Sequence, residues 1–374
     1  MKDTLRILMT TDVIGGVWHY AAELCRALSA RGHHIHLVAF PKSPTNQQLC
    51  LLPDCPRVTI SSAPYKLEWM KDPWRDIDAA GKRLLDLERS FHPDIVHLNS
   101  FSLASLPFEA PTLVVGHSCV YSWFRAVRSD IPGPEWWPYR DRVEHGLVSA
   151  DLVTAPSQSM LDSLHAEYGS FRTLGPIPNG VTTELFSQGE KRRFFLAAGR
   201  FWDEAKNLQL LDQIAPHLPW PCLVAGSLHN PAGARVSAQA VCTLGIVPPQ
   251  ELRQWYAQAP IYLSPALYEP FGLTVLEAAL SGAALILSDI PSFRELWQGA
   301  ALFVPPTEAA WVSAARMVVE NPLLRARLAA DARRRANKFN SSLMGERYEQ
   351  QYFALCGRPK RLQARSNELS AAWR

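Results

Sequence analysis

The feature that most constrains the fold is an alternation of short apolar strands with helical segments, which runs through the chain twice. The strands predicted in the first half are Arg6–Thr11, His34–Phe40, Asp94–Asn99, Thr112–Ser118 and Asp151–Ser157. Strands that are separated by helical segments form parallel, doubly wound sheets, because each crossover helix packs back onto the sheet. The N-terminal half is therefore predicted to be an α/β domain.

The same pattern starts again after a Pro/Gly break at Ile177–Val181 and a charged stretch at Gly189–Arg193. The strands predicted there are Phe194–Gly199, Cys222–Gly226, Thr243–Val247, Ile261–Pro265 and Ala284–Ser288. Residues 307–339 are strongly helical, and an amphipathic stretch at 344–355 precedes a polar, basic end. We expect three parts: residues 1–182, residues 190–341, and a final segment 342–374 that holds a helix and a basic tail.

Composition excludes several classes of protein. The chain has 374 residues, enough for two domains, and its 47% hydrophobic and 20% charged residues are ordinary for a soluble protein. A net charge of +3 without a basic stripe argues against nucleic-acid binding. The sequence contains no signal-peptide pattern and no run of about 18 apolar residues. Seven cysteines at irregular spacings, without a Cys-x-x-Cys pair, argue against zinc and for reduced thiols in a cytoplasm.

The segment 268–278, YEPFGLTVLEA, carries the strongest functional signal. It follows a predicted buried strand, and Gly272 allows a tight turn before a helix that begins at about Leu273. The free N–H groups of a helix N-terminus form an anion site. Glu269 and Glu277 flank that site, so the pattern predicts a diphosphate with hydroxyl groups beside it, as in a sugar nucleotide. The alternative is a surface loop and an amphipathic helix, but carboxylates beside a phosphate site are otherwise unfavourable.

This segment, followed by Ser281-Gly282 and the apolar strand Ala284–Ser288, resembles the donor-site signature of retaining glycosyltransferases of family 4. The resemblance implies the GT-B architecture, in which two Rossmann-like domains with doubly wound parallel sheets face each other across a cleft. It also implies that the final helix crosses back onto the N-terminal domain. In this family the backbone around Gly272, Leu273 and Thr274 holds the donor diphosphate.

Gly15 and Gly16 lie between the first predicted strand and the first helix, where ligands bind in open α/β sheets. The pair does not form a G-x-G-x-x-G pattern, and a tight turn explains it equally well in isolation. The resemblance implies that this turn approaches the donor phosphates and the acceptor.

Arg200 ends a predicted strand, and Lys206 follows six residues later, just before a helix. Arginine offers a bidentate fork and lysine a point charge, so the two can converge on one diphosphate. Two isolated surface cations are the alternative. The resemblance implies that both neutralise the leaving diphosphate.

His117 is predicted near the end of its strand, where a lone histidine is often structural. The resemblance places such a histidine beside the hexose, close to the anomeric carbon. Glu295 also matches the family, and we expect it to cap the turn at Ser292 or to pair with Arg294.

One stretch of the N-terminal half has no single interpretation. Aromatic and arginine side chains gather there: Trp123, Arg125, Arg128, Trp136, Trp137, Tyr139, Arg140 and Arg142. They can stack on an acceptor, in which case Trp123, Arg125 and Arg128 are the candidates, or lie at a lipid headgroup surface, or pack within a long loop.

The resemblance implies a retaining transfer of a hexose from a nucleoside diphosphate sugar, with a UDP-hexose favoured over GDP-mannose. No metal and no cofactor are expected. His117, Arg200, Lys206 and Glu269 carry the transfer, Glu277 holds the ribose, and the base lies near residues 245–247. The acceptor is a saccharide, a lipid-linked sugar or a small molecule, as in polysaccharide biosynthesis, either free in the cytoplasm or at the inner face of a membrane. A phosphorylase or epimerase on the same fold, and a non-catalytic donor-binding subunit, are the alternatives.

Overall fold

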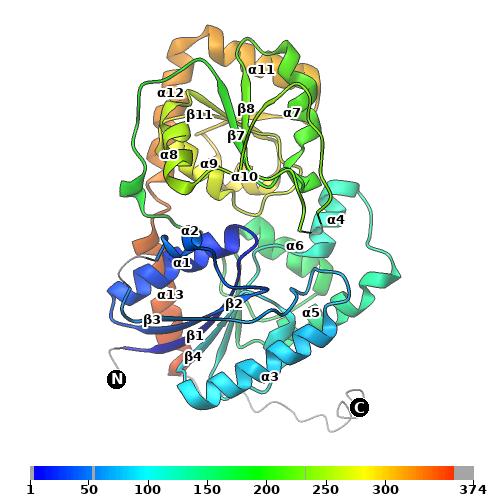
Figure 1. Cartoon of the computed structure of the whole chain (residues 1–374), viewed down its shortest axis with the longest axis vertical. Helices are drawn as coiled ribbons and strands as arrows, with labels where there is room; N and C mark the ends of the chain where they lie inside the picture. The colour runs from blue at the N-terminus through cyan, green and yellow to red at the C-terminus, as the bar shows by residue number, and fades with distance from the viewer. Residues whose placement is uncertain (1–3, 53–54, 232, 358–374) are drawn as a thin grey trace.

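The computed structural model describes residues 4–52, 55–231 and 233–357, so the basic tail predicted after the last helix lies outside the described residues. Two six-stranded sheets, both entirely parallel, form the centres of two domains (Figure 1). The prediction of two Rossmann-like domains is confirmed. Among the described residues, no helix has the length and the apolar character needed to cross a bilayer.

The first sheet has the strand order β3-β2-β1-β4-β5-β6. Its strands are β1 Arg6–Asp12, β2 His34–Phe40, β3 Val58–Ser62, β4 Ile95–Leu98, β5 Thr112–Val115 and β6 Leu152–Thr154. Edge strand β3 was not predicted, because its side chains are mostly half-buried and give no apolar run. The order of strands reverses between β1 and β4, which creates a switch point where ligands bind in such sheets.

Helices cover both faces of this sheet and complete its two apolar clusters. They are α1 Gly16–Ala30, α3 Trp74–Phe91, α4 Val120–Arg128, α5 Trp137–Ser149 and α6 Gln158–Tyr168. The short helix α2 Asn46–Leu49 has no buried residue.

The second sheet has the order β12-β11-β10-β7-β8-β9, which is the arrangement of the first sheet read from the opposite edge. Its strands are β7 Phe195–Ala198, β8 Cys222–Ala225, β9 Cys242–Gly245, β10 Ile261–Ser264, β11 Ala284–Ser288 and β12 Leu302–Val304. Its helices are α7 Leu208–Ile214, α8 Pro249–Gln258, α9 Leu273–Leu280, α10 Pro291–Trp297, α11 Glu308–Glu320 and α12 Pro322–Ala336. The long helical segment divides at Pro322, because proline interrupts helical hydrogen bonding. The switch point here lies between β7 and β10.

The last described helix, α13 Ser341–Cys356, returns to the N-terminal domain and packs against α1 (Figure 1). Met344, Tyr348, Tyr352 and Leu355 join the apolar cluster beneath the first sheet. The Tyr352 hydroxyl also lies 2.6 Å from Nδ1 of the buried His97 on β4. Helix α13, at the end of the described chain, therefore forms part of the core of the N-terminal domain.

Candidate functional site

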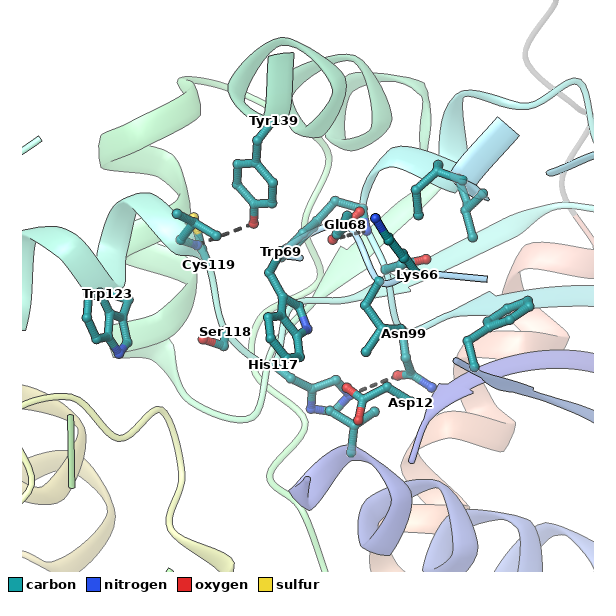
Figure 2. Close-up of a pocket in the computed structure, with 18 of the residues that line it drawn as sticks. Asp12, Lys66, Glu68, Trp69, Asn99, His117, Ser118, Cys119, Trp123 and Tyr139 are labelled. Atoms are coloured by element: carbon teal, nitrogen blue, oxygen red, sulfur yellow. Dashed lines mark hydrogen bonds between the residues drawn. The ribbon is translucent and has the colours of Figure 1, made fainter. Parts of the chain in front are cut away.

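Two cavities lie at the carboxyl ends of the two sheets. The charged cavity, about 460 Å³ in volume, lies between the domains. It is lined by Gly15, Gly16, His117, Arg200, Lys206, Glu269, Gly272, Leu273, Thr274 and Glu277. The aromatic cavity, about 610 Å³, extends from it into the N-terminal domain (Figure 2). It is lined by Asp12, Phe40, Glu68, Trp69, Asn99, His117, Trp123, Phe124, Trp136 and Arg200, among others. The two cavities share Val17, His117, Ser118, Trp123, Arg200 and Asp203.

The turn before α9 gives the charged cavity its positive end. Gly272 has φ = +88°, in the left-handed region where glycine carries no steric penalty, and it is the residue from which α9 starts. No side chain caps this helix. Its first N–H groups and the positive end of its dipole therefore remain available for an anion.

Two cations from the loop after β7 also line the charged cavity. Lys206 forms an ion pair with Glu269, and both side chains are largely buried. Arg200 is half-exposed, stacks on Trp202 with its guanidinium carbon 5.4 Å from the ring centre, and lies 3.7 Å from Asp203. The structure therefore brings Arg200, Lys206 and Glu269 together at the tip of α9.

The Gly15 turn comes into close contact with the second domain. A Cβ atom at Gly15 would lie 1.9 Å from Nη1 of Arg200, so any larger residue would displace the guanidinium. Gly15 thus lets a cation of the C-terminal domain rest on the backbone of the N-terminal domain.

The far end of the charged cavity is formed by Glu277 on α9 and by Ile246 and Val247 after β9. Burial raises the pKa of Glu277 to about 7, so its charge depends on pH in the physiological range. Ile246 is exposed and offers an apolar surface at the predicted position of the base. Among the described residues, no three His, Cys, Asp or Glu side chains gather as a set of metal ligands.

His117 lies two residues beyond β5, because the strand ends at Val115 and is shorter than predicted. Its Nε2 atom lies 2.8 Å from Oδ1 of Asn99, whose Nδ2 donates to the carbonyl of Thr10. Since the Asn99 amide orientation is fixed by that second bond, Nε2–H of His117 is the donor. Burial lowers the pKa of His117 to about 3, so the ring is neutral at physiological pH. A neutral ring can bind and position a ligand through its Nε2–H and Nδ1 atoms.

The two domains are joined by hydrogen bonds around the charged cavity. The Tyr268 hydroxyl accepts the N–H of Cys119 at 3.2 Å. The carboxylate of Glu295 accepts the N–H groups of Gln158 and Ser159, at 2.8 and 2.9 Å, at the start of α6. The expectation that Glu295 caps its own turn or pairs with Arg294 is wrong, because a helix N-terminus of the other domain offers two free donors.

Helix α4 reaches the cation loop of the C-terminal domain. The indole N–H of Trp123 donates to Oδ1 of Asp203 at 2.9 Å, and Arg128 forms an ion pair with Glu204 at 2.7 Å. Arg125 points elsewhere: it pairs with the buried Glu167 and lines neither cavity. Of the three predicted acceptor residues, Trp123 and Arg128 reach a cavity and Arg125 does not.

The remaining aromatics of this stretch divide between core, cavity and surface. Tyr139 is buried in the core and Trp136 packs partly against it, and both line the aromatic cavity. Trp137 is 61% exposed and lies outside both cavities. The packing interpretation therefore holds for Tyr139, while Trp123 and Trp136 also line a cavity.

Several residues of the aromatic cavity were not predicted. Asp12 ends β1 and Asn99 follows β4, the two strands of the switch point, so their position could have been inferred from the strand order. Glu68 and Trp69 come from a loop outside regular structure, and nothing in the sequence pattern marks them.

Comparison with known protein families agrees with this geometry. Residues 14–185 match the family described as Glycosyltransferase Family 4, and residues 183–335 match the family described as Glycosyl transferases group 1. The glycogen synthase of Mycobacterium tuberculosis is 26% identical, covering 88% of this chain and 90% of that protein. The phosphatidyl-myo-inositol mannosyltransferase of Mycolicibacterium smegmatis is 25% identical, covering 92% of each.

Solved structures show the same architecture. The sucrose-phosphate synthase from Thermosynechococcus elongatus superposes with a TM-score of 0.78 at 19% identity, over 94% of this chain and 98% of that one. Anabaena HepE in complex with UDP-glucose superposes with a TM-score of 0.72 at 16% identity, over 94% of this chain and 100% of that one. At these identities the likeness concerns the fold, which is that of the GT-B enzymes.

Proposed function

The chain belongs to the family 4 glycosyltransferases with the GT-B fold, and from that premise we propose that it moves a hexose from a nucleoside diphosphate sugar to an acceptor hydroxyl with retention of configuration. One observation carries the proposal. Arg200, Lys206 and the uncapped start of α9 converge on one cavity that also holds Glu269 and Glu277.

In this proposal the donor lies along the C-terminal domain. Its diphosphate rests at the start of α9, Glu277 accepts hydrogen bonds from the ribose, and the base lies against Ile246 and Val247. Glu269 accepts hydrogen bonds from hydroxyls of the hexose, and Lys206 is shared between Glu269 and the diphosphate. A UDP-hexose is our first choice, supported by the UDP-glucose bound to Anabaena HepE, and GDP-mannose is the second, supported by the mannosyltransferases among the relatives.

Catalysis in this scheme is electrostatic. As the bond between the anomeric carbon and the diphosphate oxygen breaks, negative charge grows on the phosphate, and Arg200, Lys206 and the N–H groups of α9 stabilise it. The acceptor oxygen forms its bond to the anomeric carbon on the same face, and its proton passes to the leaving phosphate oxygen. Positive charge is thus supplied by the chain itself, so we expect transfer to proceed in the presence of EDTA.

The stereochemical claim can be tested without knowing the acceptor. Water substitutes for the acceptor in a slow hydrolysis of the donor, and proton NMR reads the anomer of the released hexose before it equilibrates. With UDP-glucose, whose hexose is α-linked, α-glucose should appear first. Initial release of β-glucose would contradict retention, and release of glucose 1-phosphate that requires orthophosphate would identify a phosphorylase.

A further inference from the structure

The aromatic cavity shows which acceptor chemistry the enzyme accepts, provided that the proposed function holds. The cavity opens beside the charged cavity at His117 and Ser118, so a molecule bound in it would present its near end to the donor hexose. Its volume of about 610 Å³ lies in the range of pockets that enclose a small organic molecule.

The polar groups inside the cavity are mostly used by the protein itself. Both carboxylate oxygens of Glu68 are occupied, by the N–H groups of Phe101 and Ser102 and by the Ser102 hydroxyl. The amide of Asn99 is occupied by His117 and by the backbone of Thr10. These groups support the loops around the cavity and leave little hydrogen-bonding capacity for a ligand.

The charged residues at the rim are exposed and similarly engaged. Nζ of Lys66 donates to the carbonyl of Lys71 at 3.0 Å, and Arg128 pairs with Glu204. Glu135 adds a negative charge at the same rim. Helix α4 starts at this cavity without a side-chain cap, but the N–H groups of Cys119 and Val120 there donate to tyrosine hydroxyls. A phosphorylated acceptor would therefore find few free donors among the described residues of this cavity.

Aromatic side chains make up much of the wall. The Trp69 indole lies in the middle of the cavity, between the end formed by Tyr139 and Glu68 and the end formed by His117 and Asp12 (Figure 2). Trp69 is only half-buried, and so are Trp123, Phe124 and Trp136. Rings that line a cavity without being buried in the core leave apolar surface for a ligand to cover.

Two oxygen-bearing side chains of the wall, Asp12 and Ser100, keep an oxygen without a hydrogen-bond partner among the described residues. One carboxylate oxygen of Asp12 accepts the N–H groups of Ile14 and Gly15, at 2.9 and 3.3 Å, while the other has no hydrogen-bond partner among the described residues. The buried hydroxyl of Ser100 is also unpartnered within that part of the chain. Asp12 lies close to His117, which lines both cavities (Figure 2).

We propose that the acceptor is an uncharged small molecule with a largely apolar, aromatic or fused-ring body and a hydroxyl group. The body lies against Trp69, Trp123 and Phe124, and the hydroxyl donates to the free oxygen of Asp12. As the diphosphate leaves, the hydroxyl turns its proton from Asp12 to the leaving phosphate oxygen and gives it up there, while the hydroxyl oxygen bonds to the anomeric carbon.

Two other acceptor classes, saccharides and lipid-linked sugars, fit this cavity less well. Indole rings also stack on sugars, but a saccharide carries a hydroxyl on nearly every carbon, and burying these without partners is costly. A lipid-linked sugar has the same requirement at its reacting end and adds a charged phosphate. An acceptor with an apolar body and few hydroxyl groups matches the aromatic lining of this cavity.

Isothermal titration calorimetry with 2-naphthol, on the full chain saturated with UDP, tests the proposal by binding alone. We expect saturable binding that weakens at least fivefold in Trp69→Ala and is retained in Trp69→Phe, which keeps an aromatic ring. Trp137→Ala is the matched control, because Trp137 is an exposed tryptophan outside both cavities, and it should bind as the wild type does. If 2-naphthol does not bind, or binds equally well to Trp69→Ala, the proposal is wrong.

A transfer assay complements the titration. With radiolabelled UDP-glucose or GDP-mannose, whichever binds, 2-naphthol and β-estradiol should yield at least ten times more glycoside than maltose, myo-inositol or fructose 6-phosphate. Preference for one of the latter three, or for a polyprenyl diphosphate-linked sugar in micelles, would overturn the inference and leave the proposed function intact. If neither donor binds nor is hydrolysed, the proposed function itself fails.

Asp12→Asn tests the role of the carboxylate. The asparagine oxygen can still accept the N–H groups of Ile14 and Gly15, so the turn is preserved. We expect transfer to 2-naphthol to fall at least tenfold in kcat, while UDP binding and slow donor hydrolysis persist. Equal losses of transfer and hydrolysis would show that Asp12 supports the fold of the site and does not orient the acceptor.

Discussion

The charged cavity and the aromatic cavity meet at His117, yet they are built in opposite ways. The charged cavity is formed by turns that directly follow strands, and its polar groups face an open space at a helix N-terminus. The aromatic cavity is formed largely by loops and by α4, and its polar groups mostly bond to the protein itself. This difference is what the two proposals require, namely a charged donor in the first cavity and an apolar acceptor in the second.

The largest effect is expected in the charged cavity. Lys206→Ala removes a cation that we place at the developing phosphate charge, so kcat should fall about a hundredfold or more. The variant should remain folded, because Lys206 lies at the cavity and not in the core. Lys82→Ala, at an exposed position of α3, is the control and should keep wild-type turnover. If the kcat of Lys206→Ala stays within tenfold of the wild-type value, the electrostatic mechanism is contradicted.

Glu277→Gln should separate stability from donor binding. Burial raises the pKa of Glu277 from 4.5 to about 7, so the folded protein holds a proton that the unfolded chain releases between these values. Wild-type stability should therefore fall as the pH rises through this window. Glutamine does not ionise, so the variant does not lose stability in this way. Its free energy of unfolding should exceed that of the wild type by about 1–2 kcal/mol at pH 8 and by little at pH 4. Thermal unfolding at both pH values measures the difference.

The same carboxylate should make donor affinity depend on pH. Wild-type affinity for the favoured nucleotide sugar should rise roughly tenfold from pH 6 to pH 8, because the ionised form of Glu277 accepts the ribose hydroxyls. The affinity of Glu277→Gln should be lower and nearly flat over this range by calorimetry. A variant that binds as tightly as wild type at pH 8 would show that Glu277 does not contact the donor.

Trp123→Phe tests the connection between the two cavities. Phenylalanine keeps an aromatic wall but loses the N–H that donates to Asp203, a hydrogen bond of about 0.5–1.5 kcal/mol. We expect kcat/KM for the acceptor to fall about threefold to tenfold in steady-state assays, with little change in UDP affinity. Trp137→Phe should change neither quantity, and an equal effect of both substitutions would mean that the hydrogen bond is not involved.

The smallest effect on activity is expected at Arg125. Because Arg125 lines neither cavity, Arg125→Ala should leave acceptor KM unchanged. It removes the partner of the buried Glu167, which should lower the free energy of unfolding by about 1 kcal/mol in a denaturant titration. A severalfold rise in acceptor KM without loss of stability would place Arg125 in the acceptor site after all.

The two cavities also differ in how far the sequence predicts them. Strand ends, glycine turns and charges at fixed spacing are local features, and they predict Gly272 with Glu277 as one anion site and Arg200 with Lys206 as one pair of cations. The family resemblance then implies that the two groups face the same diphosphate. Asp12 and Asn99 could have been added, since each follows a strand of the first switch point.

The rest depends on tertiary structure that no local pattern encodes. Trp69 and Glu68 occupy a loop without periodicity, and this loop is tied to the cavity by the N–H groups of Phe101 and Ser102, which donate to Glu68. Glu295 matches a sequence pattern, but its partners lie 136 and 137 positions away on α6. Edge strands β3 and β12 were missed because half-buried strands carry weak apolar signals.

The central claim, a nucleoside diphosphate sugar in the charged cavity, is tested most directly by thermal unfolding with a panel of nucleotides and nucleotide sugars, with and without magnesium. A ligand at 100 times its dissociation constant adds about 2.7 kcal/mol of stability, which gives a clear rise in Tm. We predict that Tm rises with one nucleotide sugar and with the corresponding nucleoside diphosphate, equally with and without magnesium. In Glu277→Ala, the rise in Tm over the same variant without ligand should be smaller than in the wild type. No rise with any nucleotide would contradict the account.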